Sequence, residues 1–200
     1  MKWHPREDIL ASSSYDNKIK LFKVGWVTKG YTNRRDAFVI HFQEEDDDWI
    51  CFATLNSHES TVWSLAFDST GTRIASVSED LTLKIWREFK AGNREGISAG
   101  ADPTWKCVAT LGGYHKRCPY DVDWCHKSGL IATACGDNGI RLFKMKADDS
   151  CELVCCLEDA HSQDVNCVAW NPVKEGLLAS TSDDGEIKIW KIIGDADDQC

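Results

Sequence analysis

The sequence contains no apolar run that approaches the ~20 residues needed to span a bilayer. It contains no N-x-S/T glycosylation site, and its first residues, Met1-Lys2-Trp3-His4-Pro5, lack the apolar core of a secretory signal. Basic residues are also few, since 23 Lys and Arg stand against 32 Asp and Glu, for a net charge of −9. These absences argue against a membrane-spanning or secreted protein. The acidic balance argues against binding to nucleic acid or to an anionic membrane surface.

Motifs for common catalytic and cofactor sites are absent as well. The sequence has no P-loop, no G-x-G-x-x-G and no H-E-x-x-H. Ten cysteines are present, but no C-x2–4-C pair is followed by a second such pair, as zinc sites usually require. We therefore expect no metal and no cofactor. The cysteines are interpreted as reduced thiols, most of them packed as small hydrophobes, with Cys200 exposed and free in the polar tail.

What the sequence does contain is an internal repeat. Four segments share an apolar-Ala-Ser/Thr strand, a turn aspartate, and an aromatic residue six positions after that aspartate. Three of the four are preceded by a histidine that lies nine residues before another aromatic residue. The four segments cover residues 10–22, 74–86, 131–143 and 178–190, and the histidines are His58, His115 and His161.

Within each repeat, apolar and polar residues alternate with the period of a β-strand, as in Thr82-Leu83-Lys84-Ile85-Trp86. Each unit is therefore predicted to be a four-stranded antiparallel sheet, and helix is expected to be nearly absent. The predicted fold class is all-β. The blades are expected at about 1–54, 55–110, 111–156 and 157–191, followed by a polar tail at 192–200.

These residues resemble the WD40 repeat, whose fold is a β-propeller. The resemblance implies that a histidine, a strand serine or threonine, a turn aspartate and an aromatic residue form a hydrogen-bonded tetrad in each blade. Phenylalanine has no N–H to donate, so the third network is expected to be weaker, as is that of the first blade, which has Phe22 and no histidine. The expected tetrads are His58, Ser76, Asp80 and Trp86; His115, Thr133, Asp137 and Phe143; and His161, Ser180, Asp184 and Trp190.

A His/Ser/Asp set also invites interpretation as a catalytic triad. Because the set recurs at fixed spacing in several blades and catalysis needs one site, we expect a structural role and no enzymatic activity. The residues expected near a partner-docking mouth of the propeller are Trp63, Glu79, Tyr120, Asn166 and Asp183.

Longer stretches of the sequence, including residues 58–67, 132–137 and 161–172, are similar to the WD40 subunits of the cytosolic iron–sulfur protein assembly targeting complex. That resemblance implies a cytoplasmic, non-catalytic scaffold, with the nucleus as a further location. The implied partners are a client-targeting subunit, a HEAT-repeat adaptor, an iron-only-hydrogenase-like carrier and apo iron–sulfur proteins. The alternative is a WD40 adaptor of another assembly, such as a ubiquitin-ligase substrate receptor.

The resemblance also implies seven blades, of which this sequence carries about four, the first incomplete. We expect the chain to begin inside a blade, with about three blades missing upstream. The spacing between tetrad aromatics is 64 residues from Phe22 to Trp86, against 57 and 47 for the later gaps. Residues 24–43 account for the excess. They are either a natural loop insertion or a retained intron that keeps the reading frame.

Overall fold

The computed structural model describes residues 1–24 and 49–193. Every helix or strand assigned in these residues is a β-strand, so none of them forms a helix that could cross a membrane. This confirms the predicted all-β class. The strands are β1 (Lys2–Trp3), β2 (Ile9–Ser13), β3 (Lys18–Val24), β4 (Trp49–Asn56), β5 (Val62–Phe67), β6 (Arg73–Ser78), β7 (Leu83–Phe89), β8 (Thr104–Leu111), β9 (Pro119–Trp124), β10 (Leu130–Cys135), β11 (Ile140–Met145), β12 (Cys151–Leu157), β13 (Val165–Trp170), β14 (Leu177–Ser182) and β15 (Ile187–Lys191).

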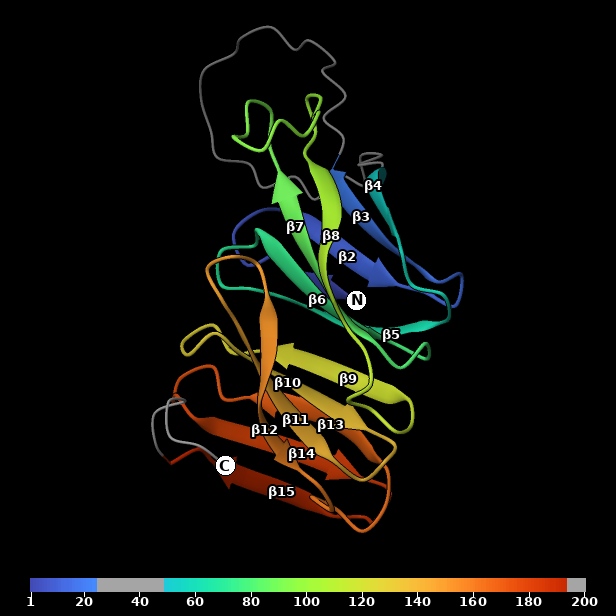
Figure 1. Ribbon diagram of the computed structural model, residues 1–200, viewed down its shortest axis with the longest axis vertical. Helices are drawn as coiled ribbons and strands as arrows, with labels where there is room; N and C mark the ends of the chain where they lie inside the picture. The colour runs from blue at the N-terminus through green and yellow to red at the C-terminus, as the bar shows by residue number, and fades with distance from the viewer. Residues whose placement is uncertain (25–48, 194–200) are drawn as a thin grey trace, which may run out of the picture.

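The strands form four antiparallel sheets in chain order, β1–β4, β5–β8, β9–β12 and β13–β15. In Figure 1 the strands of the first two sheets lie side by side in the upper half, and those of the last two sheets fill the lower half, with the red β15 at the bottom. The first strand of each sheet contacts the first strand of the next, as β5 does with β9 and β9 with β13. This arrangement is the partial β-propeller that the repeat predicts, and we call the sheets blades 1 to 4.

Two details differ from a plain fourfold repeat of four-stranded sheets. Blade 4 has three strands among the described residues, with β15 at its edge. Strand β1 in blade 1 is two residues long. Of the predicted insert at 24–43, only Val24 lies among the described residues, at the end of β3, so the nature of the insert stays a prediction.

The turn aspartate of the repeat has a local role that is the same in all four blades. Its carboxylate accepts the backbone N–H two residues later, which is an Asx-type turn that joins the second and third strands. The residue between them has positive φ in every blade: Asn17 (66°), Leu81 (65°), Asn138 (65°) and Gly185 (80°). The aspartate therefore shapes each hairpin, even at Leu81, where the side chain is not one that favours this conformation.

The hydrophobic core lies between the blades. Three buried clusters occupy the interfaces of blades 1 and 2, 2 and 3, and 3 and 4. Leu83 and Ile85 on β7 are fully buried in this way, whereas the matching residues of blade 4, Ile187 and Ile189, are 73% and 67% exposed. The difference arises because no further sheet among the described residues covers that face of blade 4.

Polar contacts also connect the first strands of neighbouring blades. Asp121 on β9 accepts a hydrogen bond from Ser64 Oγ of blade 2 at 2.7 Å and one from the backbone N–H of Val168 of blade 4 at 3.1 Å. One carboxylate thus links three blades near the middle of their inner strands. The relative positions of these strands are fixed by hydrogen bonds as well as by packing.

Candidate functional site

One end of the partial propeller gathers the predicted site residues, and we call it the docking mouth. In each of blades 2 to 4 the start of the inner strand pairs with the end of the second strand, as Val62 pairs with Ser78 and Val165 with Ser182. The start of each inner strand and the turn between second and third strands therefore lie at the same end of the sheet. Glu79 and Asp183 lie in these turns.

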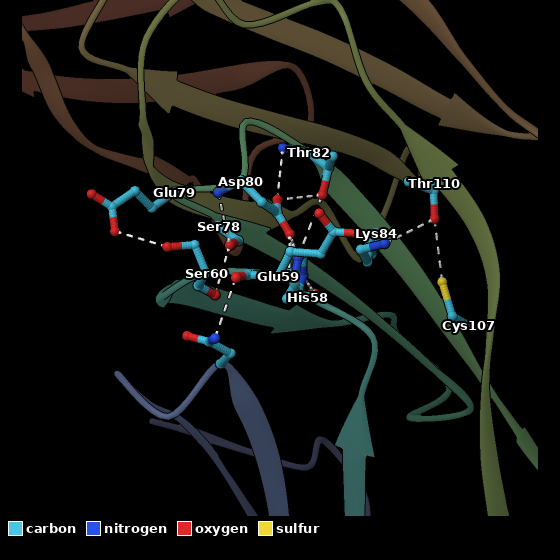
Figure 2. A network of polar contacts seen from close by, with 12 residues as sticks. His58, Glu59, Ser60, Ser78, Glu79, Asp80, Thr82, Lys84, Cys107 and Thr110 are labelled. Atoms are coloured by element: carbon cyan, nitrogen blue, oxygen red, sulfur yellow. Dashed lines mark hydrogen bonds and ion pairs between the residues drawn. The ribbon is translucent and has the colours of Figure 1, made fainter.

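In blade 2 the structure brings the four predicted tetrad residues together. His58 Nδ1 lies 2.8 Å from Asp80 Oδ2, and His58 Nε2 lies 2.8 Å from Ser76 Oγ (Figure 2 shows His58, Asp80 and their neighbours). Trp86 Nε1 donates to the same Ser76 Oγ at 2.8 Å. Asp80 is also held by Thr82, whose backbone N–H and hydroxyl donate at 3.0 and 2.6 Å.

These contacts define the direction of hydrogen bonding. The ionised carboxylate of Asp80 can only accept, so His58 donates to it from Nδ1. The neutral ring then accepts at Nε2 from Ser76 Oγ, which itself accepts the indole N–H of Trp86. Blade 4 has the same arrangement at His161, Ser180, Asp184 and Trp190, with distances of 2.9, 2.7 and 2.8 Å.

Blade 3 is built differently. His115 Nε2 lies 3.0 Å from Thr133 Oγ1, but no hydrogen bond joins His115 to Asp137. Asp137 is bound instead by Arg141, whose Nη1 and Nη2 donate to its two oxygens at 2.9 and 2.7 Å. The repeat position of Arg141 is occupied by lysine in blades 2 and 4, as Lys84 and Lys188. In addition, the Phe143 ring packs against the His115 ring.

The electrostatics follow from burial and from these partners. Burial lowers the pKa of His58, because desolvation disfavours the charged ring. The pKa of His115 falls to about 4, through burial first and then the positive charge of Arg141. Burial opposes ionisation of Asp137, but the Arg141 guanidinium outweighs it and lowers its pKa to about 2. Blades 2 and 3 therefore favour a neutral imidazole and an ionised aspartate.

This geometry does not suit nucleophilic catalysis. Ser76 and Thr133 are 0% exposed and Ser180 is 1% exposed, so no substrate carbonyl can reach these hydroxyls. The Ser76 and Ser180 oxygens also accept an indole N–H, which uses a lone pair that an attacking oxygen would need. The tetrads are better understood as buried networks that join the strands of one blade.

No disulfide joins the cysteines within the described residues. Burial raises the pKa of Cys135, Cys151 and Cys167 to about 12 and that of Cys118 to about 11, so these sulfurs are protonated at neutral pH. Among the described residues, one group of side chains has a spacing that suits a metal ion, His161, Asp184 and Glu186. Its histidine and aspartate are already bonded to each other within the tetrad.

The three inner-strand residues predicted at the docking mouth share one backbone feature. Each is the extra residue of a β-bulge. In each case the residues before and after it pair with two adjacent residues of the second strand, so the residue between them has no cross-strand partner. The flanking residues are Val62 and Ser64 opposite β6, Pro119 and Asp121 opposite β10, and Val165 and Cys167 opposite β14. The residues left without a cross-strand partner are Trp63, Tyr120 and Asn166. Bulges re-aim side chains, and here they do so at one position in the inner strand of each of blades 2 to 4.

Two of the bulge residues belong to a continuous aromatic row across three blades. The Trp63 ring lies edge-on to Tyr120, with centroids 5.9 Å apart, and also to Tyr15 of blade 1, at 5.5 Å. Tyr15 is 76% exposed and Trp63 is 38% exposed. Sequence reasoning missed Tyr15, although it occupies the same repeat position as Glu79 and Asp183 and could have been found by that alignment.

At the far end of the row, Tyr120 meets a cluster of polar groups. Its hydroxyl donates to Asp164 Oδ2 at 3.3 Å, and Arg117 Nη1 binds Asp164 Oδ1 at 2.7 Å. Gly136 lies beneath, and a Cβ added there would come within 3.1 Å of the Tyr120 ring. Asn166 is not part of the row, since its amide donates to Asp183 at 2.5 Å within blade 4.

The sequence matches the family described as "WD domain, G-beta repeat" over residues 1–23, 49–87, 105–144 and 151–191. It is 55% identical over 152 residues to a protein of Aedes aegypti named "Probable cytosolic iron-sulfur protein assembly protein Ciao1", covering 73% of this chain and 45% of that relative. A Culex quinquefasciatus protein of the same name is 52% identical over 75% of the chain and 46% of the relative. The Homo sapiens protein CIAO1, described in the same words, is 50% identical over 52% of the chain and 32% of the relative. The chain thus spans less than half the length of these relatives.

Proposed function

Because the chain belongs to the WD40-repeat family, we propose that it supplies four blades of a non-catalytic scaffold for cytosolic iron–sulfur protein assembly. The observation that carries this proposal is the 55% identity to a relative whose name refers to cytosolic iron–sulfur protein assembly. In this proposal the docking mouth receives partner proteins, and Trp63, Glu79, Tyr120, Asn166 and Asp183 contribute to the contact. The proposed location is the cytoplasm, with the nucleus as a second one.

The proposed partners are a client-targeting subunit, a HEAT-repeat adaptor, an iron-only-hydrogenase-like carrier and the apo iron–sulfur proteins that receive clusters. The scaffold holds no cluster itself. Support for this comes from the cysteine spacing, because no C-x2–4-C pair is followed by a second such pair. Support for a docking role comes from the aromatic row, because exposed tryptophan and tyrosine are enriched among the residues that dominate binding energy at interfaces.

The test is affinity purification of the protein, tagged at its own locus, followed by identification of the captured proteins. We expect the client-targeting subunit and the HEAT-repeat adaptor. Depleting the protein should also lower the activity of cytosolic iron–sulfur enzymes and leave mitochondrial ones unchanged. Recovery of cullin-type ligase components in place of these subunits would assign the scaffold to a different assembly.

A further inference from the structure

The aromatic row lies next to carboxylates that have no basic partner. Glu79 accepts a hydrogen bond from Ser60 Oγ at 3.0 Å (Figure 2), and its backbone N–H donates to the carbonyl of Thr61, two residues before Trp63. Asp183, in the corresponding turn of blade 4, accepts a hydrogen bond from the side-chain amide of Asn166. No ion pair to Glu79 or Asp183 occurs within residues 1–24 and 49–193.

A second observation places the charge of Glu79 close to Trp63. Val62 and Ser78 are cross-strand partners at adjoining ends of β5 and β6, and Trp63 and Glu79 directly follow them in the sequence. Both residues are exposed at this end of blade 2. An aromatic ring and an unpaired anion thus border the same piece of surface.

Two cations of the docking mouth, Lys116 and Arg117, are already bound to carboxylates. Arg117 is held by Asp164 at 2.7 Å and also donates to the Gly136 carbonyl at 2.5 Å, and Lys116 pairs with Glu158 at 3.2 Å. An acidic partner would have to compete with these internal carboxylates. The Glu79 carboxylate, in contrast, has no ion-pair partner among the described residues and could pair with a basic group of a partner.

Resting on the proposed docking function, we propose that the aromatic row of Tyr15, Trp63 and Tyr120 binds an arginine side chain of a partner protein, whose guanidinium lies against Trp63 and pairs with Glu79. A guanidinium is attracted to the face of an aromatic ring and, unlike an ammonium, also stacks on it. Its planar fork binds a carboxylate through two parallel hydrogen bonds. The row and Glu79 together offer both kinds of contact. A nucleic-acid base could stack on the same rings, but its phosphates would be repelled by this acidic surface.

The position of the row is well defined before any partner binds. The backbone N–H of Val62 donates to the Ser14 carbonyl at 3.1 Å, which fixes the loop that carries Tyr15 against the strand that carries Trp63. Ser13 Oγ also reaches the Trp63 carbonyl at 3.4 Å. Binding therefore orders little of the surface, which favours affinity.

The first experiment uses the 200-residue chain with 15N-labelled indoles and a short probe peptide, acetyl-Gly-Arg-Gly-Arg-Gly-amide. The indole peak of Trp63 is assigned with Trp63→Phe. We expect this peak to shift on titration. The citrulline peptide, which has the same shape without the charge, should bind about tenfold more weakly and the lysine peptide several-fold more weakly, as cation–π and guanidinium pairing require.

Variants separate the two contacts. Glu79→Gln should weaken binding of the arginine peptide about fivefold and remove most of its advantage over citrulline. Tyr15→Ala changes a mostly exposed ring and should weaken binding without affecting folding. Glu175→Gln is the matched control, because Glu175 is an exposed carboxylate in the β13–β14 turn at the opposite end of the sheets, and it should leave binding unchanged.

Equal binding of the arginine and citrulline peptides, or no shift of the Trp63 peak, would overturn this inference. If the tagged protein still captured the targeting-complex subunits in that case, the proposed function would stand with a different contact. If the arginine peptide bound as expected but those subunits were never captured, the arginine site would stand and the proposed function would be rejected.

Discussion

Arg141 donates hydrogen bonds to both carboxylate oxygens of Asp137. This occurs in blade 3, whose tetrad histidine makes no hydrogen bond to its aspartate. Both side chains are almost completely buried, at 3% and 7% exposure. In blades 2 and 4 the equivalent aspartates bind His58 and His161 at 2.8 and 2.9 Å. Blade 3 has therefore exchanged a histidine–aspartate contact for an arginine–aspartate ion pair.

The first prediction concerns that ion pair. Arg141→Ala leaves a buried carboxylate without its partner and should lower the free energy of unfolding by about 3 kcal/mol. The control is the double variant Arg141→Lys with Phe143→Trp, which restores the residues of blade 2 and should stay within about 1 kcal/mol of the parent. Urea unfolding followed by circular dichroism measures both. A change below 0.5 kcal/mol for the alanine variant, on the order of ordinary surface substitutions, would show that the pair is not stabilising.

The second prediction concerns the two complete tetrads. Asp80→Ala removes the acceptor of His58 and of Thr82, and Asp184→Ala does the same for His161 and Glu186. Each substitution should lower the free energy of unfolding by about 1–3 kcal/mol, because a buried donor is left unsatisfied. Asp148→Ala serves as the control, since Asp148 is exposed and bonds to Ser150 alone. Denaturation midpoints like that of the control would contradict the tetrad assignment.

The third prediction concerns pH. His115 has a pKa of about 4 in the folded protein, against the ordinary histidine value of 6.5 in the unfolded chain, so the unfolded chain binds more protons between these values. Its contribution to stability is thus fully present above pH 6.5 and is lost as the pH falls towards 4. The loss should reach about 3 kcal/mol over that range. His115→Gln should flatten the profile measured by urea unfolding at pH 7, 5.5 and 4.5, although His58 adds a slope of the same sign. An unchanged slope would mean that His115 is already charged in the folded state.

The fourth prediction concerns docking. Trp63→Ala combined with Tyr120→Ala in the tagged protein removes two of the three rings of the aromatic row. Capture of the targeting-complex subunits should be lost, because aromatic anchors dominate such interfaces. Thermal unfolding should remain cooperative, which separates loss of binding from loss of folding. Undiminished capture would reject the docking mouth as the binding surface.

The fifth prediction uses Gly136. An alanine Cβ here would lie 3.1 Å from the Tyr120 ring and 3.2 Å from Asp164 Oδ2, so Tyr120 must move and its hydrogen bond to Asp164 must weaken. Gly136→Ala should therefore shift the Trp63 indole peak and weaken partner capture. Gly112→Ala is the control, since its Cβ would meet Thr82 alone, at 3.9 Å. Equal behaviour of the two variants would show that Tyr120 does not need its present position.

Sequence spacing was sufficient for the all-β fold, because the repeat marks each hairpin with its aspartate and each strand with its alternation. The same spacing places the docking residues after the blade histidines. It does not reveal why they project towards the mouth, since the bulges at Trp63 and Tyr120 are features of strand register and have no composition signal of their own. The sequence also could not predict that Asp137 pairs with Arg141 instead of His115. The sequence shows Phe143 in the tryptophan position, but the arginine that takes the aspartate lies at a repeat position where lysine is the rule.

The exposure of Ile187 and Ile189 has a consequence for how unfolding proceeds. A row of sheets that touch only their neighbours behaves approximately as a one-dimensional chain of coupled units, whose total stability is a sum of unit and nearest-neighbour terms. Among the described residues, blade 4 has a single neighbouring interface and lacks a fourth strand, whereas blades 2 and 3 each have two interfaces. Blade 1 also has a single interface, but it has four strands. Blade 4 should therefore open more readily than blades 2 and 3, so that amide hydrogens of β14 and β15 exchange with solvent sooner than those of β6 and β10.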